Sequence, residues 1–269
     1  MKPKAPKKTR SKPVRIILNI VVILTLLVTF ILVGFVLWAL NPLGPGQGAL
    51  TALESDDFVQ VRTLSNNWII FDPSPSPGQD LGNHPKGLIF YPGGRVDYRS
   101  YAPGLRKIAE LGIPVVLVPA PLNLMVLGSA RAVQVVERFP QVNQWALAGH
   151  SLGAAMAAYL LYAQPQVRES ITSLVLWAGY PAENWDLSTS GLQVLSITAD
   201  QDLVFNRESF ETGKALLPPD TQFIEILGGN HAGFGDYGAQ PEDGRATISW
   251  DRQTTEAALL TAGFLFSRP

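Results

Sequence analysis

Serine, histidine and aspartate, the three residue types of a nucleophilic triad, occur in this chain at places where each could act. Ser151 lies in the turn Gly149–Gly153, whose sequence is Gly-His-Ser-Leu-Gly. A serine hydroxyl is a weak nucleophile until a base removes its proton, and that base is usually a histidine held by a carboxylate. A Gly-x-Ser-x-Gly turn between a strand and a helix exposes such a serine at a sharp bend. We therefore predict Ser151 as a nucleophile.

The residues around this turn carry more weight than the pattern itself. In a chain with 24 glycines, a Gly-x-Ser-x-Gly sequence arises by chance in roughly one such chain in ten. Here an apolar segment, Trp145–Ala148, precedes the turn, and an alanine-rich segment without a helix breaker, Ala154–Leu160, follows it. These flanks predict the strand and the helix that the turn requires. The alternative interpretation is a glycine-rich turn in a Rossmann-like domain.

The chain has three histidines that could serve as the base. His84 lies in a loop rich in proline and glycine and comes before the nucleophile, whereas in this arrangement the acid and then the histidine follow the serine. His150 lies beside Ser151, where we expect its side chain to point away from the nucleophile. His231 follows a predicted strand, residues 222–227, in a glycine-rich loop. His231 is therefore the predicted general base.

The carboxylate that would hold this histidine is expected after the preceding strand. Residues 192–198 have the apolar pattern of a strand, and Asp200 and Asp202 follow it. A carboxylate at that strand end can reach the histidine and hold its tautomer. The Asp-Leu-Val sequence favours Asp202 as the acid, with Asp200 as the alternative. Glu183 and Asp186, which follow the strand before, are further candidates.

Two backbone N–H groups are candidates for stabilising the oxyanion of a tetrahedral intermediate. One comes from the residue after the nucleophile, here Leu152, and the other from a loop that follows an earlier strand. That loop contains Gly93 and Gly94, after a predicted strand that ends at Tyr91. Adjacent glycines let the backbone approach a substrate without side-chain contacts. The alternative is an ordinary Pro-Gly-Gly turn.

Apolar strand patterns alternate with helix patterns from residue 87 onward, which predicts an α/β domain. Continuous apolar strands are typical of a mostly parallel central sheet with helices on both faces. An antiparallel hairpin over 58–61 and 68–72 precedes them. The predicted strands are 87–91, 113–118, 174–177, 192–198 and 222–227, the predicted helices are 100–111, 126–139, 207–217 and 254–266, and 145–160 contains the strand and the helix of the turn.

The short segment between Ser151 and Asp202 is already filled by a helix, a strand and loops. No large lid is therefore expected over the site, and the cleft should be open. Trp185, Phe234 and Tyr237 lie in the loops that would surround this cleft, so each is a candidate for its wall, with packing within the loop as the alternative.

The N-terminus has the pattern of a membrane anchor. Residues 1–15 carry seven Lys and Arg residues and no acid, and residues 16–40 are apolar apart from three polar members. At about 1.5 Å per residue this run can span the roughly 30 Å hydrocarbon core. The alternatives are a buried core helix and a cleaved signal peptide, which has a shorter apolar core and a small-x-small cleavage site.

The basic residues set the expected orientation, because cytoplasmic flanks carry an excess of Lys and Arg. We predict a single-pass protein of the cell membrane whose catalytic domain is extracytoplasmic. The predicted parts are a basic cytoplasmic head over 1–15, a transmembrane signal anchor over 16–40, a linker over 41–56 and an α/β domain over 57–269.

Composition excludes several classes of function. The chain has no cysteine, so it has no disulfide, no thiolate metal site and no cysteine nucleophile. Beyond residue 15 the 14 remaining basic residues face 22 acidic ones, a net charge of −8. An acidic body without a basic, aromatic surface argues against nucleic acid as a partner. The sequence also contains no cluster of histidines and acids at metal-ligand spacing.

From Trp68 to the C-terminus, the chain resembles the α/β-hydrolase superfamily, in particular its small, lidless, dienelactone-hydrolase-like bacterial members, called α/β-hydrolase family 5. The resemblance rests on the segments 90–94, 148–153, 202–204 and 229–231. It implies the α/β-hydrolase fold and the hydrolysis of an ester, thioester or similar acyl bond without a metal or cofactor. Dienelactone hydrolases use a cysteine nucleophile, whereas this chain has a serine.

These features predict a membrane-anchored serine hydrolase that acts on a small-molecule acyl substrate through Ser151, His231 and Asp202. Transfer of the acyl group to an alcohol in place of water is a variant of the same chemistry. Because folds of this kind also occur in proteins without catalysis, the alternative is a non-catalytic scaffold or binding protein at the membrane.

Overall fold

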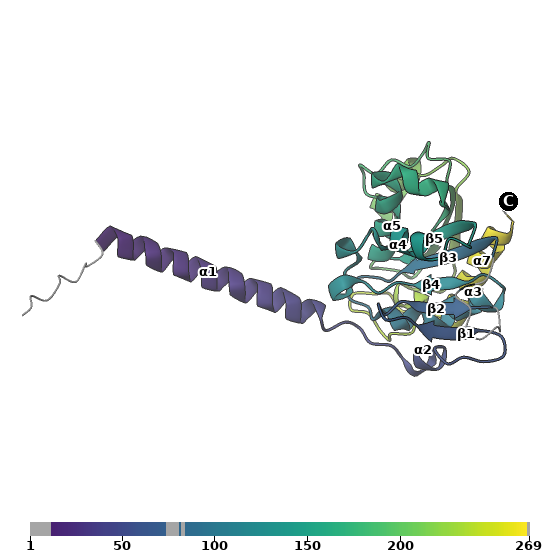
Figure 1. Ribbon diagram of the computed structural model, residues 1–269, viewed down its shortest axis with the longest axis horizontal. Helices are drawn as coiled ribbons and strands as arrows, with labels where there is room; N and C mark the ends of the chain where they lie inside the picture. Colours follow the sequence, from purple (N-terminus) through teal and green to yellow (C-terminus); the bar gives the residue numbers. More distant parts are fainter. Residues whose placement is uncertain (1–11, 74–80, 82–83, 268–269) are drawn as a thin grey trace, which may run out of the picture. The chain divides into compact units, whose positions relative to one another are not determined.

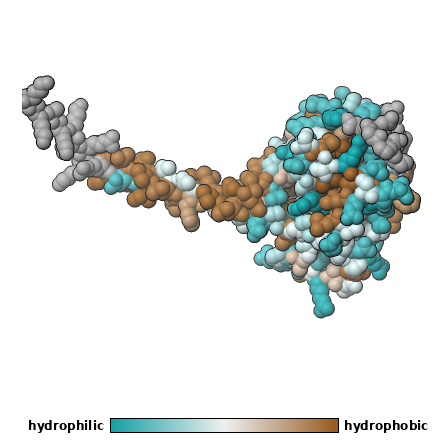
Figure 2. All heavy atoms as spheres, turned by 60° about the horizontal axis from the view of Figure 1, so that its bottom comes forward, coloured by the Kyte–Doolittle hydropathy of each residue, from teal (hydrophilic) through white to brown (hydrophobic). Residues whose placement is uncertain are grey.

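The computed structural model describes residues 12–73, 81 and 84–267. The chain divides into two compact units, residues 1–41 and 42–269. The first contains helix α1, Lys12–Ala39, whose described side chains are mostly hydrophobic (Figure 2). Within this helix, Ile16–Ala39 has a mean hydropathy of 3.2 and is long and apolar enough to cross a membrane.

The described part of the second unit is built on an eight-stranded sheet in the order β1-β2-β4-β3-β5-β6-β7-β8 (Figure 1). β2 is antiparallel to both β1 and β4, and the other neighbours are parallel. The predicted hairpin and the mostly parallel sheet are confirmed. The strands are β1 Gln60–Thr63, β2 Ile69–Asp72, β3 Lys86–Tyr91, β4 Val115–Leu117, β5 Gln144–His150, β6 Ile171–Trp177, β7 Gln193–Ala199 and β8 Gln222–Ile226.

Helices cover both faces of this sheet. Successive side chains of a strand point to opposite faces, so Leu88 and Phe90 of β3 lie in one buried cluster and Ile89 and Tyr91 in another. Helices α3 and α7 contribute to the first cluster and α4 and α5 to the second. The helices of this unit are α2 Gln47–Thr51, α3 Ala102–Glu110, α4 Arg131–Arg138, α5 Leu152–Ala163, α6 Arg207–Gly213 and α7 Trp250–Phe266.

Helix boundaries depart from the prediction where side-chain caps or turns intervene. Helix α7 begins at Trp250, before the predicted residue 254, because the Ser249 side chain accepts the N–H of Arg252 at 3.2 Å. The predicted helix over 126–139 is interrupted. Met125–Leu127 forms a separate 3₁₀ turn, and α4 follows it.

All residues of the predicted linker, 41–56, except the first belong to the second unit. Leu43 forms a parallel β-bridge with Val96. Helix α2 follows, and the carboxylate of Asp236 accepts the N–H of Ala49 near its start at 2.8 Å. A carboxylate there satisfies an N–H group that has no partner within the helix. This segment therefore forms hydrogen bonds with the rest of the second unit, although the sequence predicts a linker here.

Candidate active site

Ser151 stands at the sharp bend between β5 and α5, as the sequence predicts. Its backbone has φ 52° and ψ −120°, a conformation that residues other than glycine rarely adopt. Such backbone strain costs on the order of 1–3 kcal/mol and persists only where the surroundings hold it. The surrounding hydrogen bonds include that from the Ser151 N–H to the carbonyl of Trp177, at 2.9 Å.

The two glycines of the turn are required by close backbone approach. A Cβ on Gly149 would lie 2.5 Å from the carbonyl carbon of Gly153, and one on Gly153 would collide with the carbonyl oxygen of Tyr91. Helix α5 can therefore lie directly on β5 and β3 only if both positions lack a side chain. This contact holds the start of the helix, and with it Ser151, at the carboxyl end of the sheet.

Asp202 and His231 meet through the loops after β7 and β8. The Nδ1 atom of His231 lies 2.7 Å from Oδ2 of Asp202, and both residues are buried. The other oxygen of Asp202 accepts the N–H groups of Val204 and Phe205 at 3.0 and 2.8 Å. These bonds hold the carboxylate in place, so the ring of His231 receives a fixed acceptor at Nδ1.

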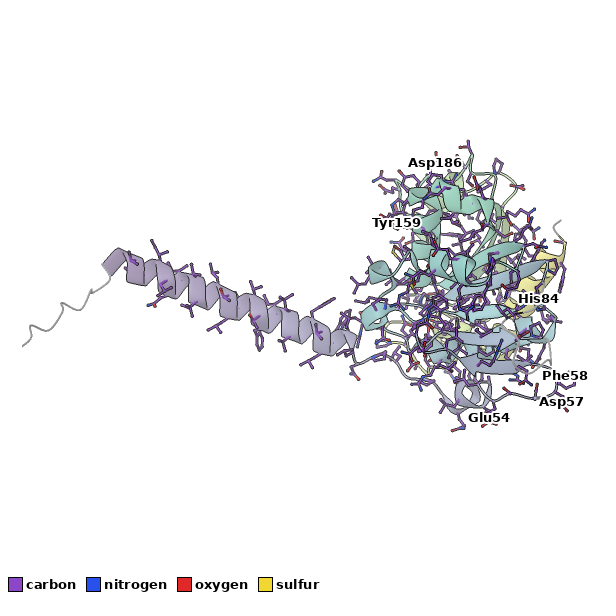
Figure 3. All side chains as sticks on the ribbon, viewed as in Figure 1. Glu54, Asp57, Phe58, His84, Tyr159 and Asp186 are labelled. Carbon is purple, nitrogen blue, oxygen red and sulfur yellow. The ribbon has the colours of Figure 1, made fainter. Side chains whose placement is uncertain are left out.

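The alternative acids have other partners. Asp200 accepts the N–H of Gly228 at 2.5 Å and an amide N–H of Gln201 at 2.8 Å. Asp186 lies at the surface, where it accepts the N–H of Ser188 (Figure 3). The structure therefore pairs His231 with Asp202 rather than with Asp200.

Of the other two histidines, only His150 lies next to His231. His84 lies 3.9 Å from Asp72 at its Nε2 atom, before the start of β3 and thus away from the carboxyl ends of the strands (Figure 3). His150, by contrast, is fully enclosed, and its ring centroid lies 4.5 Å from that of His231. His150 is therefore a neighbour of the predicted base.

A hydrogen-bonded network joins this histidine to the glycine loop, and no sequence pattern predicts it. The hydroxyl of Tyr101 accepts the N–H of Gly93 at 3.0 Å and lies 2.8 Å from Nδ1 of His150. Burial and the nearby His231 hold the pKa of His150 well below its usual value, so His150 is neutral at pH 7. Neutral imidazole carries its proton on one ring nitrogen, so the direction of the bond between Tyr101 and His150 follows the tautomer of His150.

The hydrogen bond to Tyr101 distinguishes the two glycines of this loop, Gly93 and Gly94. The N–H of Gly93 is directed to Tyr101, and a Cβ at this position would lie 2.7 Å from the hydroxyl and 2.9 Å from His150. Gly94 lies against the start of α5 instead, because a Cβ there would be 3.0 Å from Leu152. Because the N–H of Gly93 is bonded to Tyr101, Gly94 is the member of the predicted pair that stays a candidate oxyanion donor together with Leu152.

An open cleft of about 400 Å³ brings Ser151 and His231 to a common surface. Trp185 lines this cleft, as predicted, and its ring packs against Tyr159 of α5 with 4.9 Å between the centroids. The residues that line the cleft are Ser151, Leu152, Ala155, Met156, Ala178, Gly179, Tyr180, Ala182, Trp185, Val204, Phe205, Asn206 and His231.

The other two predicted wall residues belong to the core. Phe234 packs against His150 and Trp177, at centroid distances of 5.4 and 6.0 Å, and is fully buried. Tyr237 is buried against Tyr101, with 6.3 Å between the ring centroids. Both predictions were wrong because the loop after β8 folds inward, beneath the cleft.

Residues 87–255 match the model of the alpha/beta hydrolase family. The chain belongs to this family. The match covers all but the first residue of β3, strands β4 to β8, the turn at Ser151 and the loops that contain Asp202 and His231, so the family assignment applies to the part of the chain that forms the cleft. The predicted superfamily resemblance is therefore confirmed.

Solved structures share the fold of this family member at low sequence identity. They include an esterase from Pyrobaculum calidifontis (TM-score 0.56, 17% identity, 89% of this chain and 92% of that one). Also similar is one of two fungal esterases from Rhizomucor miehei (TM-score 0.53, 17% identity, 81% of this chain and 88% of that one). A third is a dienelactone hydrolase from Anabaena variabilis (TM-score 0.54, 14% identity, 78% of this chain and 98% of that one). At these identities the likeness shows the fold alone. No curated protein matches the chain in sequence.

Proposed function

We propose that the protein is a membrane-anchored serine hydrolase that cleaves an ester or a related acyl bond through an acyl-enzyme. The observation that carries the proposal is the pairing of Asp202 with His231 at a cleft that Ser151 also lines. A serine, an imidazole and a buried carboxylate at one surface are the components of nucleophilic acyl transfer. Several proteins of the same fold are named esterases, which supports the choice of an ester bond.

In the first half of the reaction, the hydroxyl oxygen of Ser151 bonds to the carbonyl carbon while its proton moves to Nε2 of His231. Asp202 accepts the Nδ1–H of His231 and stabilises the imidazolium that forms. The negative charge on the substrate oxygen is held by the N–H groups of Leu152 and Gly94 and by the positive end of α5. The bond to the leaving alcohol then breaks, and the alcohol takes the proton from His231.

In the second half, water replaces the alcohol. His231 removes a proton from the water as its oxygen bonds to the acyl carbon, and the same N–H groups hold the second oxyanion. The bond to Ser151 breaks, the serine recovers its proton from His231, and the acid leaves. Every proton that moves passes through His231, so this mechanism requires no metal and no cofactor.

Helix α1 supports the membrane part of the proposal. Its apolar stretch, Ile16–Ala39, at about 1.5 Å per residue is long enough for the roughly 30 Å hydrocarbon core. The basic residues of 1–15 favour a cytoplasmic N-terminus, which puts the catalytic unit outside the cytoplasm.

The proposal is tested on the full-length protein in detergent with a fluorophosphonate probe and short p-nitrophenyl esters. Wild type should be labelled and active, and Ser151→Ala should lose the label and at least about 10⁴-fold in kcat. Asp202→Asn should lose roughly 10⁴-fold in kcat, whereas Asp200→Asn, which keeps an acceptor for Gly228, should retain most of it. A folded wild type that takes no label and cleaves no ester would favour the non-catalytic scaffold.

A further inference from the structure

A second hollow adjoins the cleft. It has a volume of about 380 Å³ and shares two wall residues, Tyr180 and Ala182, with the cleft at Ser151. The two hollows therefore meet at one short loop segment, residues 180–182. The residues that line the second hollow are Tyr180, Pro181, Ala182, Glu183, Ser209, Thr212, Gly213 and Leu216.

The segment around α6 forms a continuous wall for both hollows. Val204, Phe205 and Asn206, immediately before α6, line the cleft, and the helix itself lines the second hollow. Between them, Tyr180 packs edge-on against Phe205 with 5.3 Å between ring centroids and lies 6.3 Å from Phe210. This aromatic contact makes the shared wall a defined surface that leads from the nucleophile outward along α6.

The walls indicate the chemistry of the occupant. Among the described residues that line the two hollows there is no lysine or arginine, and Glu183 is the one carboxylate. The cleft is otherwise lined mainly by apolar side chains such as Met156 and Trp185. A negatively charged chain would lose its water here without gaining a cation, whereas a neutral hydrocarbon chain gains from burial.

The two hollows are too large together for a short ester. Each has a volume in the lower part of the range, roughly 300–1,000 Å³, of sites that hold a whole small ligand. We propose that the second hollow is a subsite for the distal part of a long, neutral apolar chain of an ester whose carbonyl lies at Ser151. This inference rests on the proposed serine hydrolase function, and it names long-chain esters as the substrate class.

Filling the second hollow tests the proposal. Thr212 lines it from the exposed side of α6, so Thr212→Trp places an indole in the hollow without touching the cleft. The matched control is Glu208→Trp, an exposed position of the same helix that does not line the hollow. Full-length proteins in detergent are compared on p-nitrophenyl esters from acetate to dodecanoate, with melting temperatures to check folding.

We expect kcat/KM of wild type to rise with chain length beyond butyrate. Thr212→Trp should lower kcat/KM for the dodecanoate by about tenfold and leave the acetate within about twofold of wild type. Glu208→Trp should change neither. A parallel series of acetates of longer alcohols is followed by acetate release. If the alcohol chain occupies the subsite in place of the acyl chain, Thr212→Trp should lower kcat/KM for the long-alcohol acetates and not for the dodecanoate.

Two results would overturn the inference, and they are distinguishable. If the wild type hydrolyses short esters through Ser151 but Thr212→Trp alters all chain lengths alike, or none in either series, the subsite proposal is wrong and the hydrolase proposal stands. If wild type takes no fluorophosphonate label and hydrolyses no ester of either series, the hydrolase proposal fails and the subsite falls with it.

Discussion

The hydroxyl of Tyr101 connects two parts of the site that lie far apart in sequence. It accepts the N–H of Gly93 in the loop after β3, and it forms a hydrogen bond with Nδ1 of His150 at the end of β5. A hydroxyl can do both at once because it has one proton and two lone pairs. The position of Gly94 therefore depends on a side chain that touches no substrate, and we regard Tyr101 as a positioning residue.

Tyr101→Phe should lower kcat by about tenfold with a smaller change in KM, because a displaced oxyanion donor weakens binding of the transition state more than that of the substrate. Tyr91→Phe is the matched control. The Tyr91 hydroxyl is also buried, accepts the N–H of Ala132 at 2.7 Å and donates to the carbonyl of Ser129 at 2.6 Å. Steady-state kinetics and thermal melting of both variants check this prediction.

Both variants should lose stability, since each leaves a backbone N–H without its buried acceptor, at a cost of roughly 1–3 kcal/mol. Only Tyr101→Phe should lose turnover. Equal losses of kcat in the two variants would mean that the effect is general destabilisation, and Tyr101 would then have no positioning role.

At the level of single residues, the sequence could predict the candidates but not their surroundings. Ser151, His231 and Asp202 could be selected because each lies at the end of a recognisable strand and few alternatives exist. The contact of His150 with Tyr101 joins residues 49 positions apart, and no local pattern signals it. Which of two neighbouring aspartates faces the histidine likewise depends on the turn that Asp202 makes with its own following N–H groups.

Among the elements, the segment that follows α1, residues 43–49, forms hydrogen bonds that the sequence did not predict. The N–H of Leu43 donates to the carbonyl of Arg95, and the carbonyl of Leu43 accepts the N–H of Asp97, both at 2.8 Å. Farther along, the N–H of Gly46 donates to the carbonyl of Asp236 at 2.7 Å, in the loop that follows His231. This segment therefore joins the loop of the candidate oxyanion donor to the loop of the candidate base.

Leu43→Pro should lower kcat several-fold in the full-length protein, because proline has no N–H to donate to Arg95. Leu43→Ala keeps both backbone bonds and loses only side-chain packing, so its kcat should stay close to that of wild type. The comparison is made by ester kinetics in detergent, with circular dichroism to confirm folding. Equal kcat in the two variants would contradict a role for the backbone bonds of this segment.

Elements were predictable where burial alone determines them. Strands β3 to β7 are mostly apolar because helices cover both faces, so their existence follows from composition. The ordered structure of residues 43–49 could not be predicted from composition, because Gly46 and Gly48 have no side chain that would indicate burial. These glycines are needed by a residue distant in the sequence, since a Cβ on Gly48 would lie 3.0 Å from an oxygen of Asp236. The start of α7 was missed because its first turn is polar.

The whole chain separates its charges along its length. Residues 1–15 carry seven basic side chains, and the remainder carries a net charge of −8. The apolar stretch Ile16–Ala39 lies between the two. Basic flanks remain on the cytoplasmic side during insertion, whereas acidic segments influence orientation little. The charge pattern therefore favours one orientation of the proposed anchor.

A reporter fused after Pro269 tests that orientation. Alkaline phosphatase, which matures only outside the cytoplasm, should be active there, and β-galactosidase, which works only inside, should be inactive. Replacing the seven basic residues of 1–15 by glutamine should lower the phosphatase signal, because the retained flank loses its charge. The protein should also resist extraction from membranes at alkaline pH, as an integral helix does. An active β-galactosidase fusion in wild type would place the catalytic unit in the cytoplasm, where the substrate would have to be an intracellular ester.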